Sequence, residues 1–231
     1  VLEAAGAMPE NATVGDWVRV VCEDMGLSAL LLRRANSAAY GLPGKVANVP
    51  MAVALLGGQG TRRLVLEQAA APQNAGALVA SLNRRARVLA ALSEGLAQAS
   101  GKVSRGTALT AGVLSELGNL ALFLQFPEKF EKLPPRLFGR ELADAQKKLI
   151  GLHFAQTGAA IAQAWRLPEP LCNALANQLA EPDEADNALA ALLFCCQSFA
   201  SVSSEALEQT AERESDALAM LGLRPAEALK A

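Results

Sequence analysis

Histidine is almost missing from this sequence, since His153 is the only one in 231 residues. A metal site built from several imidazole ligands is therefore arithmetically impossible. His153 as a catalyst would also need a nucleophile and an orienting group, and no Gly-x-Ser-x-Gly elbow or catalytic cysteine context accompanies it. We expect no catalytic residue, no metal ligand and no cofactor, and we interpret His153 as a structural residue.

Aromatic residues make up only 4% of the chain, and its formal net charge is only -2. Such a protein has no overall positive field to attract nucleic acid or an anionic membrane. Arginines do cluster, and a single basic face is one way to arrange them, but no aromatic residues are interleaved with them. We expect no nucleic-acid binding. The clusters lie at Arg33-Arg34, Arg62-Arg63 and Arg84-Arg85-Arg87.

The four cysteines form no CxxC pair and no spaced framework. They are typical of buried, reduced thiols, which favours a cytoplasmic protein. No positively charged region followed by an apolar region opens the chain, and no apolar run reaches transmembrane length, so we expect no membrane association. The first residue is Val, which leaves open whether further domains lie beyond the ends. The cysteines are Cys22, Cys172, Cys195 and Cys196.

What the chain has in abundance is Ala and Leu, in a composition that is 52% hydrophobic. This combination predicts an all-α fold of closely packed helices. We expect Thr13 to cap the first helix together with Asp16, Gly26 to end it, and Ser28 to cap the second. The glycine-rich segment 57–60 predicts a turn between two helices; binding of a phosphate by it is the alternative. The remaining predicted helices are Leu78–Gln98, Ala108–Leu124, Arg140–Lys148, Ala159–Trp165, Leu171–Leu179, Ala188–Ala200 and a pair within Glu205–Lys230.

The segment Ala108–Leu124 carries a single charged residue, Glu116. A helix that is apolar on every side must be surrounded by other helices, so we expect it at the centre of the fold. Gly112 and Gly118 would each weaken an exposed helix by about 1 kcal/mol, which suggests that they permit close helix contact instead. Glu116 must pair, reach a cleft or bind a proton there.

Three motifs in the first third of the chain agree with one family in sequence and spacing. The segment 31–43, LLRRANSAAYGLP, is followed by AVALLG at 52–57 and RLVL at 63–66. Together they resemble the HDOD domain, a bacterial all-helical relative of the HD metal-dependent phosphohydrolases. A later block, 151–168, also fits the family pattern. The resemblance implies one HDOD domain over residues 1–231, with an N-terminal helical sub-bundle at about 1–71, a link at Pro72–Gly76 and an HD-like sub-bundle at 77–231. It also implies structural roles for Asn36, Tyr40, Gly41, His153, Trp165 and Pro168.

The same resemblance places the metal-ligand positions of catalytic HD proteins on residues that suit a metal poorly. Ser115 falls where the family's His would be and Glu116 where its Asp would be, while Arg85 or a neighbour replaces the earlier His. Farther on, Asn177-Gln178 stands where relatives often have His. A hydroxyl is a poor ligand and a guanidinium repels a cation. We therefore expect a vestigial site in which Glu116 forms an ion pair, with Arg85 as its partner.

We expect a non-catalytic signalling or scaffold module that binds a partner protein through its helical surface and vestigial cleft. The first alternative is a sensor that binds a small anionic ligand, such as a nucleotide, with Arg85 or its neighbours as the contact. The second is residual phosphodiesterase activity. The partner, the pathway and the oligomeric state stay open at this point.

Overall fold

The computed structural model describes residues 7–9, 11–69, 76–134, 137–182 and 187–231, and within them every regular element is helical. The all-α prediction is therefore confirmed. The α-helices are α2 (Val14–Cys22), α3 (Met25–Ala35), α4 (Val49–Ala69), α5 (Ala77–Ser100), α6 (Arg105–Leu114), α7 (Leu117–Gln125), α8 (Pro127–Phe130), α9 (Gly139–Ile150), α10 (Phe154–Ala164), α11 (Glu169–Asn177), α12 (Ala188–Ala200), α13 (Leu207–Arg213), α14 (Ser215–Met220) and α15 (Pro225–Ala228), with 3-10 turns η1 (Ala38–Tyr40) and η2 (Ser204–Ala206).

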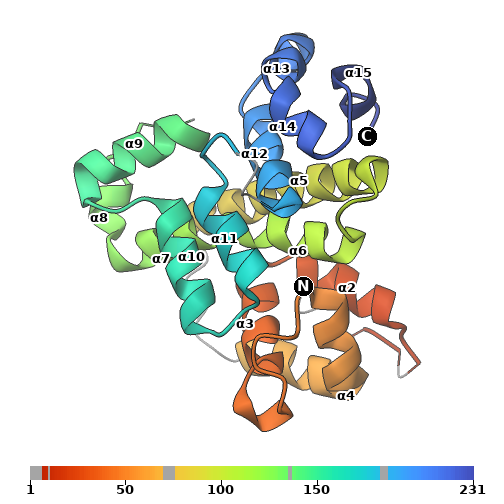
Figure 1. Ribbon diagram of the computed structural model, residues 1–231. Coiled ribbons are helices and arrows are strands. Elements are labelled where there is room, and N and C mark those ends of the chain that lie inside the picture. The colour runs from red at the N-terminus through yellow and green to blue at the C-terminus, as the bar shows by residue number, and fades with distance from the viewer. Residues whose placement is uncertain (1–6, 10, 70–75, 135–136, 183–186) are drawn as a thin grey trace.

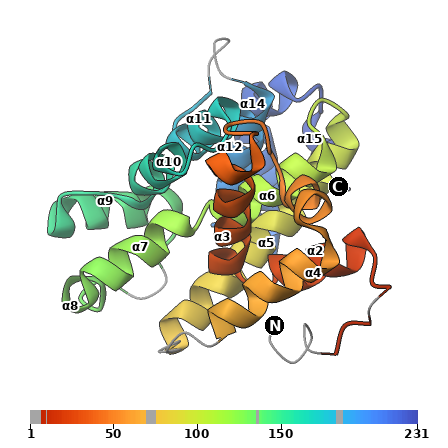
Figure 2. The ribbon, with the colours of Figure 1, turned by 90° about the horizontal axis from the view of Figure 1, so that it is seen from below.

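Helices α5 and α6 lie side by side at the centre of the molecule (Figure 1). The N-terminal helices α2, α3 and α4 pack together against one side of this pair, as the view from below shows (Figure 2). Helix α10 lies against α7, α11 lies against α6 and α10, and α12 lies against α5, α6 and α11. Helices α3, α10, α11 and α12 therefore each contact at least one of α5, α6 and α7.

Two glycines bring the central helices into close contact, as predicted. A Cβ atom on Gly112 would lie 2.6 Å from the Ala90 Cα and the Leu89 carbonyl oxygen of α5. A Cβ atom on Gly118 would lie 1.9 Å from the carbonyl oxygen of Phe154, at the start of α10. No real Cβ atom tolerates either distance, so backbone would have to move. The glycine positions therefore set the spacing of α5 from α6 and of α7 from α10.

The predicted start of the first helix is confirmed. Thr13 is the N-cap of α2, and its hydroxyl oxygen accepts the Asp16 N–H at 3.2 Å. The Asp16 carboxylate in turn accepts the Thr13 N–H at 2.9 Å, so both halves of a capping box are present.

The predicted boundary between the first two helices is wrong. Asp24, rather than Ser28, caps α3, because its carboxylate accepts the Leu27 N–H at 2.8 Å. Gly26 consequently lies inside α3 instead of ending α2. The Ser28 hydroxyl donates to the carbonyl oxygen of Val21 at 2.9 Å and ties the two helices together. Asp24 and Ser28 are both residue types that cap helices, and the sequence alone does not show which of them does so.

The glycine-rich segment interrupts α4 at one residue only. Gly57 has φ 70° and ψ 170°, values outside the helical region, and the chain is helical again before Thr61. The break is therefore an interhelical kink, and the second half of the helix starts earlier than predicted. The expected link at Pro72–Gly76 lies outside the described residues except for Gly76, the N-cap of α5. The final predicted pair is wrong, since this region forms three short helices, α13, α14 and α15.

Among the residues that the structure describes, the core forms two apolar clusters. The larger one runs from α2 to α15 and includes the central pair. A smaller one joins α7, α8, α9 and the start of α10. By length and composition alone, Arg105–Gln125 is long and apolar enough to cross a membrane, but 67% of its most apolar window is buried by the fold. This matches the prediction of a central core helix. Of the four cysteines, all free, only Cys22 is not fully buried.

Candidate functional site: the vestigial HD position and the cleft beside it

The central segment is not one helix, as predicted, but two that meet at Ser115 and Glu116. Glu116 has φ -92° and ψ 0°, and the Ser115 N–H bonds to the Gly112 carbonyl at 3.4 Å in a tightened turn. The Ser115 hydroxyl also donates to the Gly112 carbonyl oxygen, at 2.7 Å. The break leaves the Ser115 carbonyl without a helical donor, and Gln178 Nε2 approaches it at 3.4 Å. A side chain from α11 thus compensates the break.

The predicted ion pair between Arg85 and Glu116 is confirmed. Arg85 Nη2 on α5 lies 3.4 Å from Glu116 Oε1, and the Glu116 side chain is completely buried. Asn119 Nδ2, one turn further along α7, donates to Glu116 Oε2 at 2.9 Å. Both carboxylate oxygens are therefore occupied by donors of the protein itself.

Two further amides extend this network into neighbouring helices. Gln146 Nε2 on α9 donates to Asn119 Oδ1 at 2.6 Å. Gln146 Oε1 accepts the Phe154 N–H at 2.9 Å and so satisfies the first backbone donor of α10. Asn119 and Gln146 are both fully buried. The network, defined by Arg85, Glu116, Asn119 and Gln146, joins α5, α7, α9 and α10.

The electrostatics of the network are dominated by burial. Burial raises the pKa of Glu116, while the charge of Arg85 and the hydrogen bond from Asn119 lower it in part. The Arg85 guanidinium lies over the Phe138 ring, 4.2 Å from its centroid. Its Nε is buried without a hydrogen-bond acceptor among the described residues. Arg85 is thus held between a carboxylate and an aromatic ring.

A second chain of amides runs from the Ser115 carbonyl toward the surface. Gln178 of this chain was identified from the sequence, but Gln197 was not. Gln178 Nε2 donates to the Leu175 carbonyl at 2.9 Å and to the Ser115 carbonyl. Gln178 Oε1 therefore faces outward and accepts Nε2 of Gln197 at 2.8 Å. Gln197 was missed; the signal was a single long polar side chain in the otherwise apolar helix α12.

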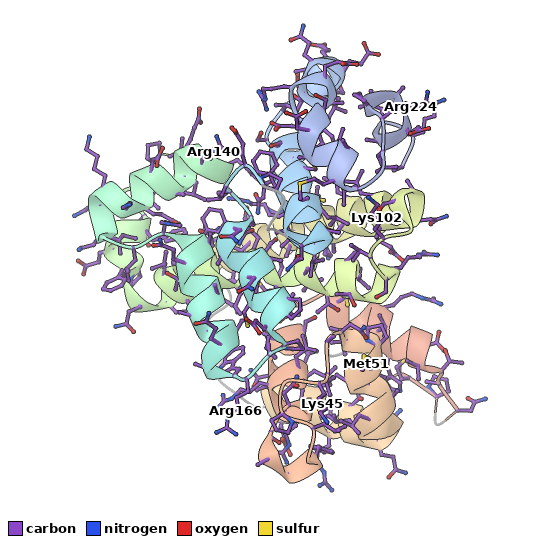
Figure 3. The ribbon with its side chains drawn as sticks, in the orientation of Figure 1. Lys45, Met51, Lys102, Arg140, Arg166 and Arg224 are labelled. Carbon is purple, nitrogen blue, oxygen red and sulfur yellow. The ribbon has the colours of Figure 1, made fainter. Side chains whose placement is uncertain are left out.

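A cleft with a volume of about 730 Å³ opens beside this second chain, between α9, α11, α12, α13 and α14. Gln178 and Gln197 line it, whereas Arg85, Ser115 and Glu116 do not. Figure 3 shows Arg140 at the end of α9 that faces α12. The open cleft and the closed network are therefore neighbours, separated by the Phe138 side chain and the two glutamines.

The residues at the vestigial positions do not fit a divalent metal ion. Glu116 already receives donors on both oxygens, and one of these donors is a cation. Across the described ranges, no three His, Cys, Asp or Glu side chains are grouped so that they can hold a metal. The Ser115 hydroxyl donates its proton to the Gly112 carbonyl oxygen of the preceding turn. That these positions correspond to the ligands of catalytic relatives stays a prediction.

The family-motif residues of the N-terminal region lie at a helix end, as predicted. Asn36 is buried at the C-cap of α3, where its Nδ2 donates to the Leu32 and Val46 carbonyls at 3.0 Å and its Oδ1 accepts the Val46 N–H at 3.1 Å. Gly41 follows η1 with φ 65°, a conformation that favours glycine. Tyr40 is partly exposed beside it. Asn36 thus fastens the loop after α3.

The motif residues of the second block also lie at helix ends. His153 is the N-cap residue of α10, and its Nδ1 is buried without a partner among the described residues. Burial, followed by the charge of Lys147, lowers the pKa of His153. Trp165 is the C-cap of α10. The Arg33 guanidinium lies over its ring, with Cζ 5.6 Å from the ring centroid. Pro168 precedes α11 and accepts the Cys172 N–H at 3.1 Å.

Several arginines of the three clusters have partners of their own. Arg33 lies over Trp165, Arg62 lies over Trp17, and Arg87 pairs with Glu23. These contacts spread over different helices. Arg34 and Arg63, by contrast, line one small cavity together with Glu67.

Comparison with known proteins agrees with the fold and motifs described above. The family model of the HDOD domain matches residues 5–181. This chain therefore belongs to the HDOD domain family.

An uncharacterized protein of Treponema pallidum (strain Nichols) is 26% identical over 182 residues, which cover 71% of this chain but 33% of that protein. The chain thus spans about a third of the length of this relative. Among solved structures, the MmoQ response regulator of Methylococcus capsulatus has a TM-score of 0.79 at 19% identity, with 100% of this chain and 95% of that one covered. A virulence factor of Campylobacter jejuni has a TM-score of 0.67 at 16% identity, with 99% and 87% covered. These structures support the fold.

Proposed function

We propose that this HDOD domain is a non-catalytic signal-transduction module of the cytoplasm that acts by binding another protein. The observation that carries the proposal is the closed network around Glu116. A carboxylate that binds a catalytic metal must offer a free oxygen, and here one oxygen faces a guanidinium and the other an amide. The structural neighbour named a response regulator adds support for a role in signalling.

The non-catalytic half of the proposal is tested by elemental analysis of the purified protein, paired with hydrolysis of bis(p-nitrophenyl) phosphate in added manganese. We expect no stoichiometric metal and no turnover above that of the variant Glu116→Gln. Stoichiometric metal together with turnover that the variant loses would contradict the proposal and define an enzyme.

The protein-binding half is tested by photo-crosslinking in the cells from which the protein comes. A photoreactive amino acid is placed at Ser201 in the cleft, at Tyr40 and at Leu124, three exposed or partly exposed positions on different helical faces. We expect a defined crosslinked complex from at least one position. No complex from any position, with the domain intact, would contradict this function.

The anionic-ligand alternative depends on Arg85 being available. Arg85 is held by Glu116 and stacked on Phe138, and it does not line the open cleft. A thermal-shift screen with nucleotides tests this alternative, because a ligand of the folded state raises the melting temperature by mass action. We expect no shift with any nucleotide.

A further inference from the structure

The floor of the cleft between α9, α11, α12, α13 and α14 holds a buried acceptor without a donor. Gln197 is 3% exposed, and its Oε1 has no hydrogen-bond partner among the described residues. Exchanging the nitrogen and oxygen of the Gln197 amide does not give this oxygen a donor. Gln178 Nε2 is committed to two carbonyls, so Gln178 Oε1 must face Gln197 and requires Nε2 there. Gln197 lines the cleft, so this buried oxygen lies at the cleft floor and lacks a hydrogen-bond donor.

The charged groups that line the cleft are predominantly acidic. They are Glu141, Glu181, Glu214 and Asp216 against Arg140 and Arg213. Each arginine is already engaged, since Arg140 Nη2 lies 3.5 Å from Glu181 and Arg213 Nε lies 2.9 Å from Glu214.

Arg140 also donates to the Leu179 carbonyl at 2.7 Å. Glu141 and Asp216 are exposed and have no ion-pair partner within the described part of the chain. The surplus is therefore negative and favours a cation.

The walls of the cleft favour a guanidinium over an ammonium. Two aromatic rings, those of Phe138 and Phe194, line it, and each already has a guanidinium of this chain over one of its faces. A guanidinium is planar, weakly hydrated and carries five donors, so one group can serve the Gln197 oxygen and a carboxylate together. An ammonium loses more hydration and stacks less well.

We propose that this cleft docks an arginine side chain of the partner protein, presented on a basic segment, with Gln197 Oε1 as the buried acceptor and Glu141 and Asp216 as the charge complement. The inference rests on the proposed function, because it names the chemistry of the protein that the module binds. A volume of about 730 Å³ accommodates the arginine together with its flanking residues.

The test uses the peptide Ac-Gly-Arg-Gly-NH2 and the side-chain amide signals of Gln197 in ¹⁵N-labelled protein. We expect saturable shifts with the arginine peptide and binding weakened by about fivefold or more when citrulline replaces arginine, since citrulline keeps donors but loses the charge. A peptide with Glu in place of Arg should not bind. Equal binding of the Glu peptide, or no shift with the arginine peptide, would overturn the inference.

Two sets of variants make the result specific. Glu141→Gln with Asp216→Asn changes two exposed side chains, so the fold is preserved, and the dissociation constant should rise by about threefold or more. The matched control, Asp144→Asn with Glu212→Gln, removes two exposed carboxylates of α9 and α13 that do not line the cleft. Equal weakening by both sets would overturn the inference. Gln197→Met should abolish the peptide-induced shifts elsewhere in the cleft.

The photo-crosslinking experiment separates this inference from the proposed function. A complex whose yield falls in the Glu141→Gln, Asp216→Asn variant supports both. A complex whose yield is unchanged in that variant overturns the docking inference and leaves the proposed function standing. Binding of the arginine peptide without any crosslinked complex supports the cleft chemistry and overturns the proposed function.

Discussion

The network around Glu116 and the cleft above Gln197 lie on either side of the same two glutamines, yet they are built in opposite ways. In the network, both Glu116 oxygens and both polar ends of Gln146 have partners inside the protein. In the cleft, the chain of amides ends on an oxygen without a donor, below uncompensated carboxylates. Among the buried side-chain atoms of the network, only Arg85 Nε lacks a hydrogen-bond partner within the described residues. A network that is satisfied at nearly every position rigidifies a fold, whereas a chain of amides that ends on an unpaired oxygen leaves an interaction to be made.

The largest effect is expected from the glycine that allows α7 to meet α10. Gly118→Ala should lower the free energy of unfolding by about 3 kcal/mol or more, because the new Cβ would overlap the Phe154 carbonyl and force apart the helices that close the network. Urea denaturation measures it. Gly15→Ala in α2 is the control, since its Cβ would meet only ordinary contacts and should change stability by no more than about 1 kcal/mol. Similar effects of the two substitutions would contradict the close packing.

The next effect concerns the ion pair. Arg85→Met should cost about 2 to 3 kcal/mol, less than for a fully buried pair because the Arg85 side chain is 22% exposed. Adding Glu116→Gln should recover part of this loss, since it removes the buried charge that lost its partner. The exposed pair of Arg105 and Glu94 supplies the control, and Arg105→Met should cost about 0.5 kcal/mol. Strictly additive losses would show that the two groups do not interact.

Substitution of Gln146 in the network and of Gln197 in the cleft tests the difference between these two regions. Gln146→Leu should cost about 2 kcal/mol, because it strands the Asn119 oxygen and the Phe154 N–H in the interior. Gln197→Met should cost about 1 kcal/mol, because only one of its two polar atoms is bonded. Chemical denaturation of both variants measures the difference. If Gln197→Met lowered the free energy of unfolding more than Gln146→Leu does, the description of the network as closed and the cleft as open would be contradicted.

The smallest effect is one of pH. The pKa of Glu116 is raised by burial, and Arg85 lowers it in part, so Arg85→Met raises it further. Between the ordinary glutamate pKa and this raised value, Glu116 is protonated more in the folded state than in the unfolded state. The stability that this extra protonation contributes is lost as pH rises through the folded pKa. The loss caused by Arg85→Met should therefore be smaller at pH 5 than at pH 8. In the Glu116→Gln background this dependence should vanish.

The sequence predicted the helical fold, the central position of 108–124, the roles of Gly112 and Gly118 and the pairing of Arg85 with Glu116. Each has a local signal, such as an apolar run with one charge or a family motif. The break at Ser115 and Glu116 had no such signal, because Gln178, which comes from another part of the sequence, donates to the Ser115 carbonyl that the break leaves free.

Gln146 was also missed, although it follows Leu142 and Ala143 on the buried face of α9 and that spacing marks it as interior. The acidic lining of the cleft escaped because α9 and α14 are far apart in sequence. Only the tertiary fold brings Glu141 and Asp216 to one opening.

The most direct test of the closed network is a titration with Mn²⁺ followed through the side-chain amide signals of Asn119. Asn119 Nδ2 donates to Glu116 Oε2 at 2.9 Å, so a manganese ion bound by that carboxylate would broaden these signals first. We expect no selective broadening at stoichiometric manganese, and spectra that match those of Glu116→Gln. Broadening of the Asn119 amide that disappears in Glu116→Gln would contradict it, because Glu116 would then be a metal ligand.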